Sequence, residues 1–375
     1  MLYQTHARIH LGNIRYNIEG IRNAVGAQRK ILIAVKANGY GHGAVEVSRM
    51  AEIIGVDWLG VATVPEGLQL REAGIRLPIL KFSPAFPEEM VVAVENNLTL
   101  TVCELENIST LQQICQEKSL HTNVHLKVDT GMGRIGVTPV EAPEMAKFIE
   151  QECPALHLEG VFTHLPVSDA VDNAYTKLQL SSFKGVVNNI QDAVGHKIAL
   201  VHCANSGAVL GYPEGWFDMV RPGIMIYGFY PGSLTPYSID LKPGLSFLTR
   251  VSFLKKVSKG TGIGYGRTWT ASEDTWIATI PAGYADGFNR LFSNTGRVLI
   301  NGRSYPVVGR VCMDQSMVNL GPETDIRVGD EVVLIGKSGA EEISAYEWAE
   351  KLNTITYEVT CQINSRVLRI YEPYE

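Results

Sequence analysis

A single lysine is the first candidate for a reactive group in this chain of 375 residues. Lys36 ends the apolar run 31–36, and Gly39, Gly41 and Gly43 follow it within a short stretch. A lysine that apolar side chains hold at a strand end has its charged form disfavoured, so its neutral amine becomes a nucleophile. The alternative is a lysine whose stem packs on the strand while its ammonium reaches water. The lysine by itself does not separate these two interpretations.

Three further charged or titratable side chains lie inside or at the end of apolar runs. Lys127 interrupts the run 124–128, and burying an ammonium group is costly. His164 and Arg221 each end such a run. The ordinary alternatives are a satisfied core histidine, an arginine in a salt bridge at a strand end, and a Lys127 that faces solvent or pairs with Asp129.

Short apolar runs alternate with amphipathic stretches over the first 230 residues, and this order determines where those side chains would lie. Eight runs are predicted strands: 31–36, 58–63, 78–82, 98–102, 124–129, 158–164, 198–203 and 219–221. A strand followed by a helix eight times predicts an α/β fold, a (β/α)8 barrel of the TIM type, although the length would also suit a doubly wound sheet. In a barrel the carboxyl ends of the strands carry the active site, so Lys36, His164 and Arg221 would face the same end.

The pattern changes to one rich in strands near residue 243. We predict strands at 248–257, 276–280, 297–300, 332–335 and 358–363, with one helix at 344–353. The expected organisation is therefore a barrel domain over residues 1–240 and a mainly β domain over residues 241–375.

Composition excludes several classes of protein. Hydrophobic residues make up 45% and charged residues 19%, which is ordinary for a globular protein and argues against disorder. The net charge of −6 gives no support to binding of nucleic acid or of an anionic membrane. No apolar run reaches membrane-spanning length, none of the six cysteines forms a CxxC pair, and no metal-binding cluster emerges. We expect a cytoplasmic protein without a metal.

Several short segments match one known family. The segment 34–43, AVKANGYGHG, resembles the attachment motif for pyridoxal 5'-phosphate in the alanine racemase family. Further segments resemble the family in the same order along both parts of the chain: 126–136, 163–164, 204–206, 220–224, 264–269, 283–287, 308–315 and 357–359. The family has a cofactor-binding barrel followed by a β domain, which agrees with the expected organisation.

The resemblance implies a pair of bases for moving the Cα proton of an amino acid. Lys36 would hold pyridoxal phosphate as an imine and act as the base on one face of Cα. A single base would return the proton to the side from which it came, so a second is needed, and Tyr265 from another copy of the chain would be that base. The family links this tyrosine to His164 and then to Arg221, and the arginine also donates a hydrogen bond to the pyridine nitrogen. Because a guanidinium keeps its proton, that nitrogen would stay unprotonated.

The resemblance also implies residues that bind the cofactor and the substrate. The cofactor-binding set is Lys36, Tyr40, Asn205, Ser206, Arg221, Gly223, Ile224 and Tyr357. Substrate binding falls to Arg134, Met313 and Tyr284, and carboxylation of Lys127 would make an anion that pairs with Arg134. Since Tyr265 and Met313 would come from a partner copy, the family arrangement is a homodimer with shared active sites.

The implied activity is interconversion of L-alanine and D-alanine, which supplies D-alanine for peptidoglycan. A serine racemase or one of broader specificity on the same scaffold is the first alternative. A related amino-acid decarboxylase is a weaker one, because Tyr265 and the segment 309–315 suit racemisation. A non-catalytic carrier of pyridoxal phosphate would lack the second domain, and a cofactor-free barrel that binds phosphorylated metabolites is the remaining alternative.

Overall fold

The computed structural model describes residues 4–170 and 172–374. The chain divides into two compact units. One unit is Asn13–Lys242, and the other joins the segment up to Gly12 to the segment from Pro243 onward. Each unit has its own hydrophobic core.

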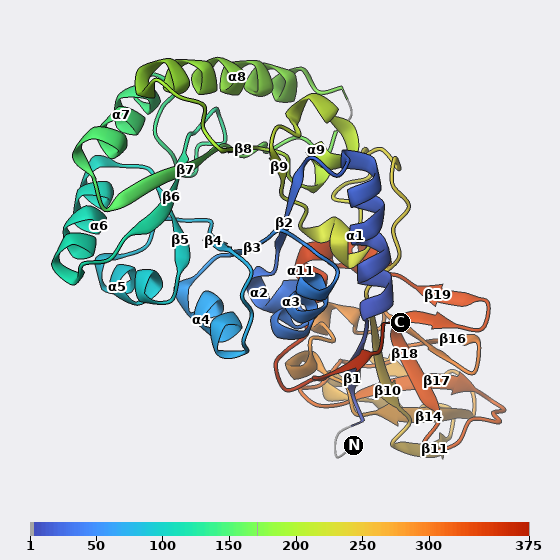
Figure 1. Cartoon of the computed structure of the whole chain (residues 1–375). Helices are drawn as coiled ribbons and strands as arrows, with labels where there is room; N and C mark the ends of the chain where they lie inside the picture. The colour runs from blue at the N-terminus through green and yellow to red at the C-terminus, as the bar shows by residue number, and fades with distance from the viewer. Residues whose placement is uncertain (1–3, 171, 375) are drawn as a thin grey trace. The chain divides into compact units, whose positions relative to one another are not determined.

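Eight parallel strands form the centre of the first unit (Figure 1). The strands are β2 (Lys30–Ala34), β3 (Trp58–Val61), β4 (Ile79–Lys81), β5 (Leu98–Val102), β6 (Thr122–Lys127), β7 (Leu156–Phe162), β8 (Leu200–His202) and β9 (Met219–Val220). They follow the order β8-β7-β6-β5-β4-β3-β2-β9, and the Asp218 amide donates to the Val201 carbonyl across the remaining gap at 3.1 Å. All eight predicted strands are present, and the predicted (β/α)8 barrel is confirmed.

Helices surround this sheet, as Figure 1 shows. They are α1 (Leu11–Val25), α3 (Ala44–Ile53), α4 (Val64–Glu72), α5 (Pro87–Glu95), α6 (Leu105–Lys118), α7 (Ala142–Glu152), α8 (Ala174–Val194) and α9 (Ser206–Gly211). In α7 the buried residues Ala142, Ala146 and Ile149 recur at helical spacing, which is why this segment packs one face on the sheet. Among the described residues, no helix is both long and apolar enough to cross a membrane.

Side chains from several strands fill the barrel. Five buried residues form one cluster with Phe82 packed against them: Leu32, Trp58, Leu80, Leu200 and Met219. Gly60 on β3 makes this packing possible, because a Cβ atom at Gly60 would lie 2.1 Å from the Phe82 ring and 2.8 Å from Leu32. Side chains from several strands therefore fill the barrel at this level, as is usual for this fold.

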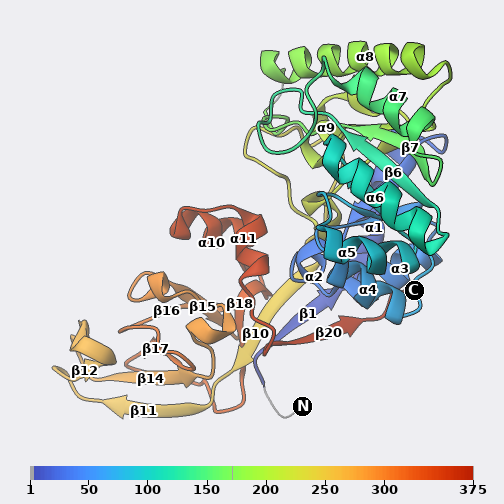
Figure 2. The same cartoon turned by 90° about the vertical axis from the view of Figure 1, so that its left-hand side faces the viewer.

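The second unit is built from three sheets (Figure 2). The largest has the order β16-β15-β18-β10-β1-β20, with β19 paired to β18: β16 (Arg303–Pro306), β15 (Arg297–Ile300), β18 (Glu331–Ser338), β10 (Leu245–Arg250), β1 (His6–His10), β20 (Leu368–Glu372) and β19 (Glu341–Ile343). The second contains β11 (Phe253–Val257), β14 (Thr275–Ile280) and β17 (Ser316–Gly321), and the third pairs β12 (Gly262–Ile263) with β13 (Trp269–Thr270). Strand β1 joins this unit because it pairs with both β10 and β20.

Two local predictions for this unit are wrong. The segment 248–257 is not one strand, because the chain changes sheets between β10 and β11. The segment 358–363 is not a strand but falls largely in the helix α11 (Thr356–Cys361), which packs beside α10 (Ala345–Leu352) (Figure 2). Its β-branched residues favour a strand, but the buried positions Thr356, Val359, Thr360 and Ile363 follow helical spacing.

We predict opposite effects of alanine at two glycines of the barrel unit. Gly60→Ala forces the Phe82 ring to move and should lower the free energy of unfolding by about 1–3 kcal/mol. Gly185→Ala is the matched control, because no atom lies within 4 Å of its added Cβ and it lies inside α8, where alanine favours the helix by up to about 1 kcal/mol. Urea unfolding measures both, and a neutral Gly60→Ala would contradict the packing described.

Candidate active site

Lys36 lies directly beyond the carboxyl end of β2, where it begins the short turn α2 (Lys36–Tyr40). Ala37, Asn38, Gly39 and Tyr40 have φ angles of 51°, 52°, 62° and 51°, so this turn is left-handed. Left-handed backbone costs roughly 1–2 kcal/mol for each residue other than glycine. Strain of this kind persists where the surrounding structure enforces it, and such places are frequently functional sites.

Neighbouring groups hold this strained turn in place. The Ala37 amide donates to Glu66 Oε1 at 2.7 Å, and the Ala44 amide donates to Asn38 Oδ1 at 3.0 Å. Glu66 is fixed in turn, because its other oxygen accepts from the Ala62 amide at 2.7 Å. The two residues that follow Lys36 are therefore each held by a group outside the turn.

Arg221 lies almost completely buried just after β9, and its hydrogen bonds organise the carboxyl end of the barrel. Its guanidinium donates to His202 Nδ1 at 2.9 Å, to the Thr163 carbonyl at 2.8 Å and to the Cys203 carbonyl at 3.2 Å. The same group lies 3.3 Å from His164 Nδ1. Burial lowers the pKa of Arg221 to about 10, so it remains a cation and a pure donor at neutral pH.

His164, just after β7, is surrounded by positive charge. Burial lowers its pKa well below the usual value for histidine, and cations add to this effect. These cations are Arg221, Arg134, Lys127 and Lys36. His164 is therefore a neutral imidazole, and four of the predicted site residues gather around it.

A hydrogen-bonded chain extends from Arg221 into the barrel. His202 Nε2 lies 2.9 Å from His125 Nδ1, and His125 Nε2 lies 3.4 Å from Glu159 Oε2. Arginine can only donate, so His202 Nδ1 must accept and its Nε2 must carry the proton. That proton points to His125 Nδ1, so the His125 proton is on Nε2 and faces Glu159. Burial lowers the pKa of both histidines, which keeps them neutral and preserves these tautomers.

His125, His202 and Glu159 are not among the site residues predicted from the sequence. Their sequence signal is the same as that of Lys127, a polar residue within an apolar run of a barrel strand. Among the described residues, no three His, Cys, Asp or Glu side chains meet as a metal site. His202 and His125 each join two neighbours in the hydrogen-bonded chain that runs from Arg221 to Glu159.

Lys127 is buried at the end of β6, with 2% of the residue exposed, and does not face solvent. Its ammonium donates to the Val128 carbonyl at 2.8 Å. Burial lowers the pKa of Lys127 to about 8, and the nearby Arg221 contributes to the shift. Asp129 receives three backbone N–H groups, those of Gly131, Met132 and Gly133, so it organises the following loop.

A group of donors lies between α9 and the segment after β9. The hydroxyl of Ser206 accepts from the Gly223 amide at 2.9 Å. A Cβ atom on Gly223 would lie 2.8 Å from Tyr40 Oη, so glycine leaves room for that hydroxyl. Within the described part of the chain, the Ser206 and Ile224 amides have no hydrogen-bond acceptor. We call these four residues, Tyr40, Ser206, Gly223 and Ile224, the donor cradle.

Asn205 supports the donor cradle from behind. Its side chain caps α9 by accepting from the Ala208 amide at 3.1 Å, and it also accepts from the Ser168 hydroxyl at 2.7 Å. It acts on the position of Ser206 through the helix that they share.

The second unit holds the other predicted residues. Tyr265 follows Gly264 at the start of a short 3-10 turn, and 73% of it is exposed. Tyr284 lies close to Met313, because the Tyr284 amide donates to the carbonyl of the adjacent Cys312 at 3.1 Å. The side chains of Tyr284 and Met313 are both exposed. Tyr357 lies in α11.

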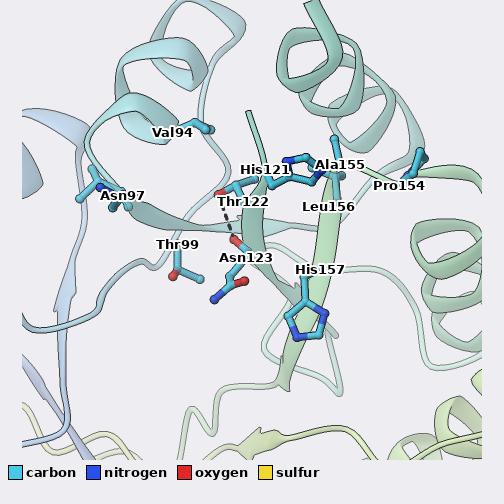
Figure 3. A pocket seen from close by; sticks show the side chains of 11 residues that line it. Val94, Asn97, Thr99, His121, Thr122, Asn123, Pro154, Ala155, Leu156 and His157 are labelled. Atoms are coloured by element: carbon cyan, nitrogen blue, oxygen red, sulfur yellow. Dashed lines mark hydrogen bonds between the residues drawn. The ribbon is translucent and has the colours of Figure 1, made fainter. Parts of the chain in front are cut away.

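A separate hollow of about 260 Å³ lies at the amino ends of β5, β6 and β7 (Figure 3). Its lining includes His121 and His157 but none of the predicted site residues. Barrel enzymes place their chemistry at the opposite rim, where Lys36 lies.

We predict that buried neutral histidines make the barrel acid-sensitive. In the unfolded chain His164 and His202 take up protons below a pH of about 6.5, whereas in the folded barrel their lowered pKa values prevent it. The unfolded state then binds more protons, so stability falls as the pH falls, by about 1.4 kcal/mol per pH unit for each histidine. His202→Asn should remove the contribution of one histidine from the slope of unfolding free energy against pH. Urea unfolding between pH 6.5 and 5 measures this slope. The exposed His196→Asn is the control, and an unchanged slope in His202→Asn would refute the prediction.

Comparison with known proteins identifies the family. Residues 9–231 match the family model "Alanine racemase, N-terminal domain", and residues 245–371 match "Alanine racemase, C-terminal domain". The chain is 48% identical to an alanine racemase of Cutibacterium acnes, over 98% of this chain and 97% of that protein, and 45% identical to one of Desulforamulus reducens, over 97% and 98%.

Solved structures agree. An alanine racemase of Clostridium difficile 630 superposes with a TM-score of 0.95 at 39% identity, covering 99% of this chain and 96% of that one. An alanine racemase from E. faecalis superposes with a TM-score of 0.93 at 37% identity, covering 99% of both chains. The chain therefore belongs to the alanine racemase family of isomerases.

Proposed function

We propose that this protein interconverts L-alanine and D-alanine with pyridoxal 5'-phosphate bound covalently at Lys36. The observation that supports this most strongly is the placement of Lys36 at the same rim of the barrel as a buried arginine and a cradle of hydrogen-bond donors. When bound, pyridoxal phosphate delocalises the negative charge that remains when Cα loses its proton. The residues of the chain must then bind the anionic groups and move that proton.

The donor cradle fits a phosphate group. Two hydroxyls, on Tyr40 and Ser206, and the amides of Ser206 and Ile224 offer donors to anionic oxygens. Gly223 lets the main chain approach closely, since any larger side chain would collide with Tyr40 Oη. We assign Asn205 to support this cradle and Tyr357 as a further contact.

Arg221 would donate to the pyridine nitrogen. Its pKa of about 10 keeps the guanidinium protonated at neutral pH, so it offers a hydrogen bond without transferring a proton. The chain through His202, His125 and Glu159 fixes the position of that guanidinium. By withholding a proton from the ring, Arg221 would weaken it as an electron sink and so suppress side reactions such as transamination.

Two bases would act on opposite faces of Cα. Lys36 supplies an amine on one face, and Tyr265 of a second copy supplies a phenolate on the other. A phenolate near neutral pH needs nearby positive charge, and in the proposed dimer the cations gathered around His164 would supply it. The 73% exposure of Tyr265 is what a residue donated to a partner requires. We therefore propose a homodimer with shared sites.

Substrate recognition would depend on charge and size. Arg134 would bind the carboxylate of alanine, with the backbone at Met313 contributing from the partner, and Tyr284 and Tyr357 would narrow the pocket toward a methyl side chain. Lys127, with its pKa lowered to about 8, presents neutral amine that can add to carbon dioxide and release a proton to solvent. The resulting carbamate would offset the surrounding positive charge and pair with Arg134. The cytoplasmic location and the supply of D-alanine for peptidoglycan stay predictions.

A chiral assay of two lysine variants tests the proposed activity. Lys36→Ala should lower alanine racemisation by at least about 10³-fold, because both the covalent attachment and one base are lost. Lys30→Ala, at the opposite end of the same strand, should match the unaltered protein. Serine, assayed in parallel, ranks the alternative substrate. If Lys36→Ala still racemises alanine, the role assigned to Lys36 is wrong. If the unaltered protein racemises serine faster than alanine, serine becomes the proposed substrate.

Mixed dimers test whether the sites are shared. Lys36→Ala and Tyr265→Phe chains should each be nearly inactive alone. After the chains exchange partners at equal amounts, half of the dimers are mixed, and each mixed dimer carries one intact site of two. Activity should therefore rise toward about a quarter of the unaltered value. No recovery, with mixed dimers confirmed by native mass spectrometry, would show that both residues act within one chain.

A further inference from the structure

Arg366 connects two acidic side chains in the second unit. Its Nε and Nη2 donate to the two carboxylate oxygens of Asp286 at 2.7 and 2.9 Å. Its Nη1 donates to Asp314 Oδ1 at 2.8 Å. Asp286 is fully buried, whereas the Asp314 side chain is 60% exposed. One guanidinium thus bridges the interior of the unit and its surface.

Each acid stands beside a residue that we propose contacts the substrate. Asp286 ends the turn Tyr284–Asp286, and its carboxylate also accepts from the Gly283 amide at 2.9 Å. Asp314 follows Met313 within a turn that is closed by a hydrogen bond from the Cys312 amide to the Gln315 carbonyl at 2.9 Å. The arginine therefore binds one residue in each of two separate turns.

The two turns also contact each other through their backbones. The amides of Tyr284 and Ala285 donate to the carbonyls of Cys312 and Met313 at 3.1 and 3.0 Å. A Cβ atom on Gly283 would lie 2.3 Å from the Met313 carbonyl oxygen, so the backbones of the two turns meet without intervening side chains. A small displacement of one turn would therefore move the other.

The segment that carries Arg366 is itself well anchored. Arg369 donates to three backbone carbonyls at 2.6 to 2.7 Å, those of Ile363, Asn364 and Val367. If Arg366 served only to neutralise buried Asp286, its two bonds to that carboxylate would suffice. The third bond reaches an exposed carboxylate, and an exposed ion pair of this kind adds little stability. The bond from Arg366 to Asp314 therefore matters for the position of the turn that carries Asp314.

We propose that Arg366 is a positioning residue for substrate recognition: it fixes the backbone at Met313 relative to Tyr284 by binding Asp314 and Asp286 together. This inference rests on the proposed function, because the substrate is taken to be a small amino acid whose carboxylate and side chain meet these two turns. Loosening the bond to Asp314 should weaken substrate binding without impairing proton transfer.

Asp314→Asn is the decisive variant, because it weakens this bond and leaves the buried pair intact. We expect KM for alanine to rise by about fivefold or more, with kcat changed by less than about twofold. Hydrogen exchange at the Tyr284 and Ala285 amides should become faster, and the melting temperature should not change. Arg366→Lys, which keeps the charge but loses the fork, should raise KM similarly. Asp325→Asn is the control, since it removes an exposed pair with Arg303 in the same unit.

Two results separate failure of this inference from failure of the proposed function. If Asp314→Asn keeps the KM and the exchange rates of the unaltered protein, Arg366 is only the partner of Asp286 and the inference is wrong. If the unaltered protein does not racemise alanine, the proposed function fails. In that case faster exchange in Asp314→Asn alone still supports the link between the turns, and unchanged exchange overturns it.

Discussion

Positive charge crowded at the carboxyl end of the barrel is the constraint on which the rest of the site depends. Lys36, Lys127, Arg134 and Arg221 all act on His164, and Arg221 is buried. The nearby carboxylate of Asp129 is already shared among three backbone amides. Buried cations need anions or fixed dipoles, so this rim favours anionic groups and keeps the surrounding histidines neutral.

The fold meets this demand with backbone carbonyls and oriented neutral groups. Arg221 donates to two carbonyls and to His202, and this last bond sets the tautomer of His202 and, through it, that of His125, whose proton faces Glu159. A carboxylate at one end of this chain and a guanidinium at the other give the two imidazoles a single direction of hydrogen bonding. These hydrogen bonds leave the Arg221 guanidinium little freedom to move.

The sequence predicted the barrel and most of its rim because those signals are local. Strands appear as apolar runs, and a polar residue at the end of a run indicates the rim. His125, His202 and Glu159 were not predicted because their partners come from other strands, and no pattern along the chain shows which interior side chains meet. The prediction of a strand at 358–363 is wrong, because the β-branched residues favour a strand but packing against α10 selects the helix. The pairing of β1 with β20 is likewise a contact across the full length of the chain.

Identification of the lysine that binds pyridoxal phosphate tests the central claim most directly. The protein is incubated with pyridoxal phosphate, reduced with borohydride to make the linkage permanent, digested and mapped by mass spectrometry. We expect Lys36 alone to carry the label, and excess inorganic phosphate, which competes for the donor cradle, to slow labelling. A label on Lys127 or on any other lysine in place of Lys36, or no label at any lysine, would contradict this expectation.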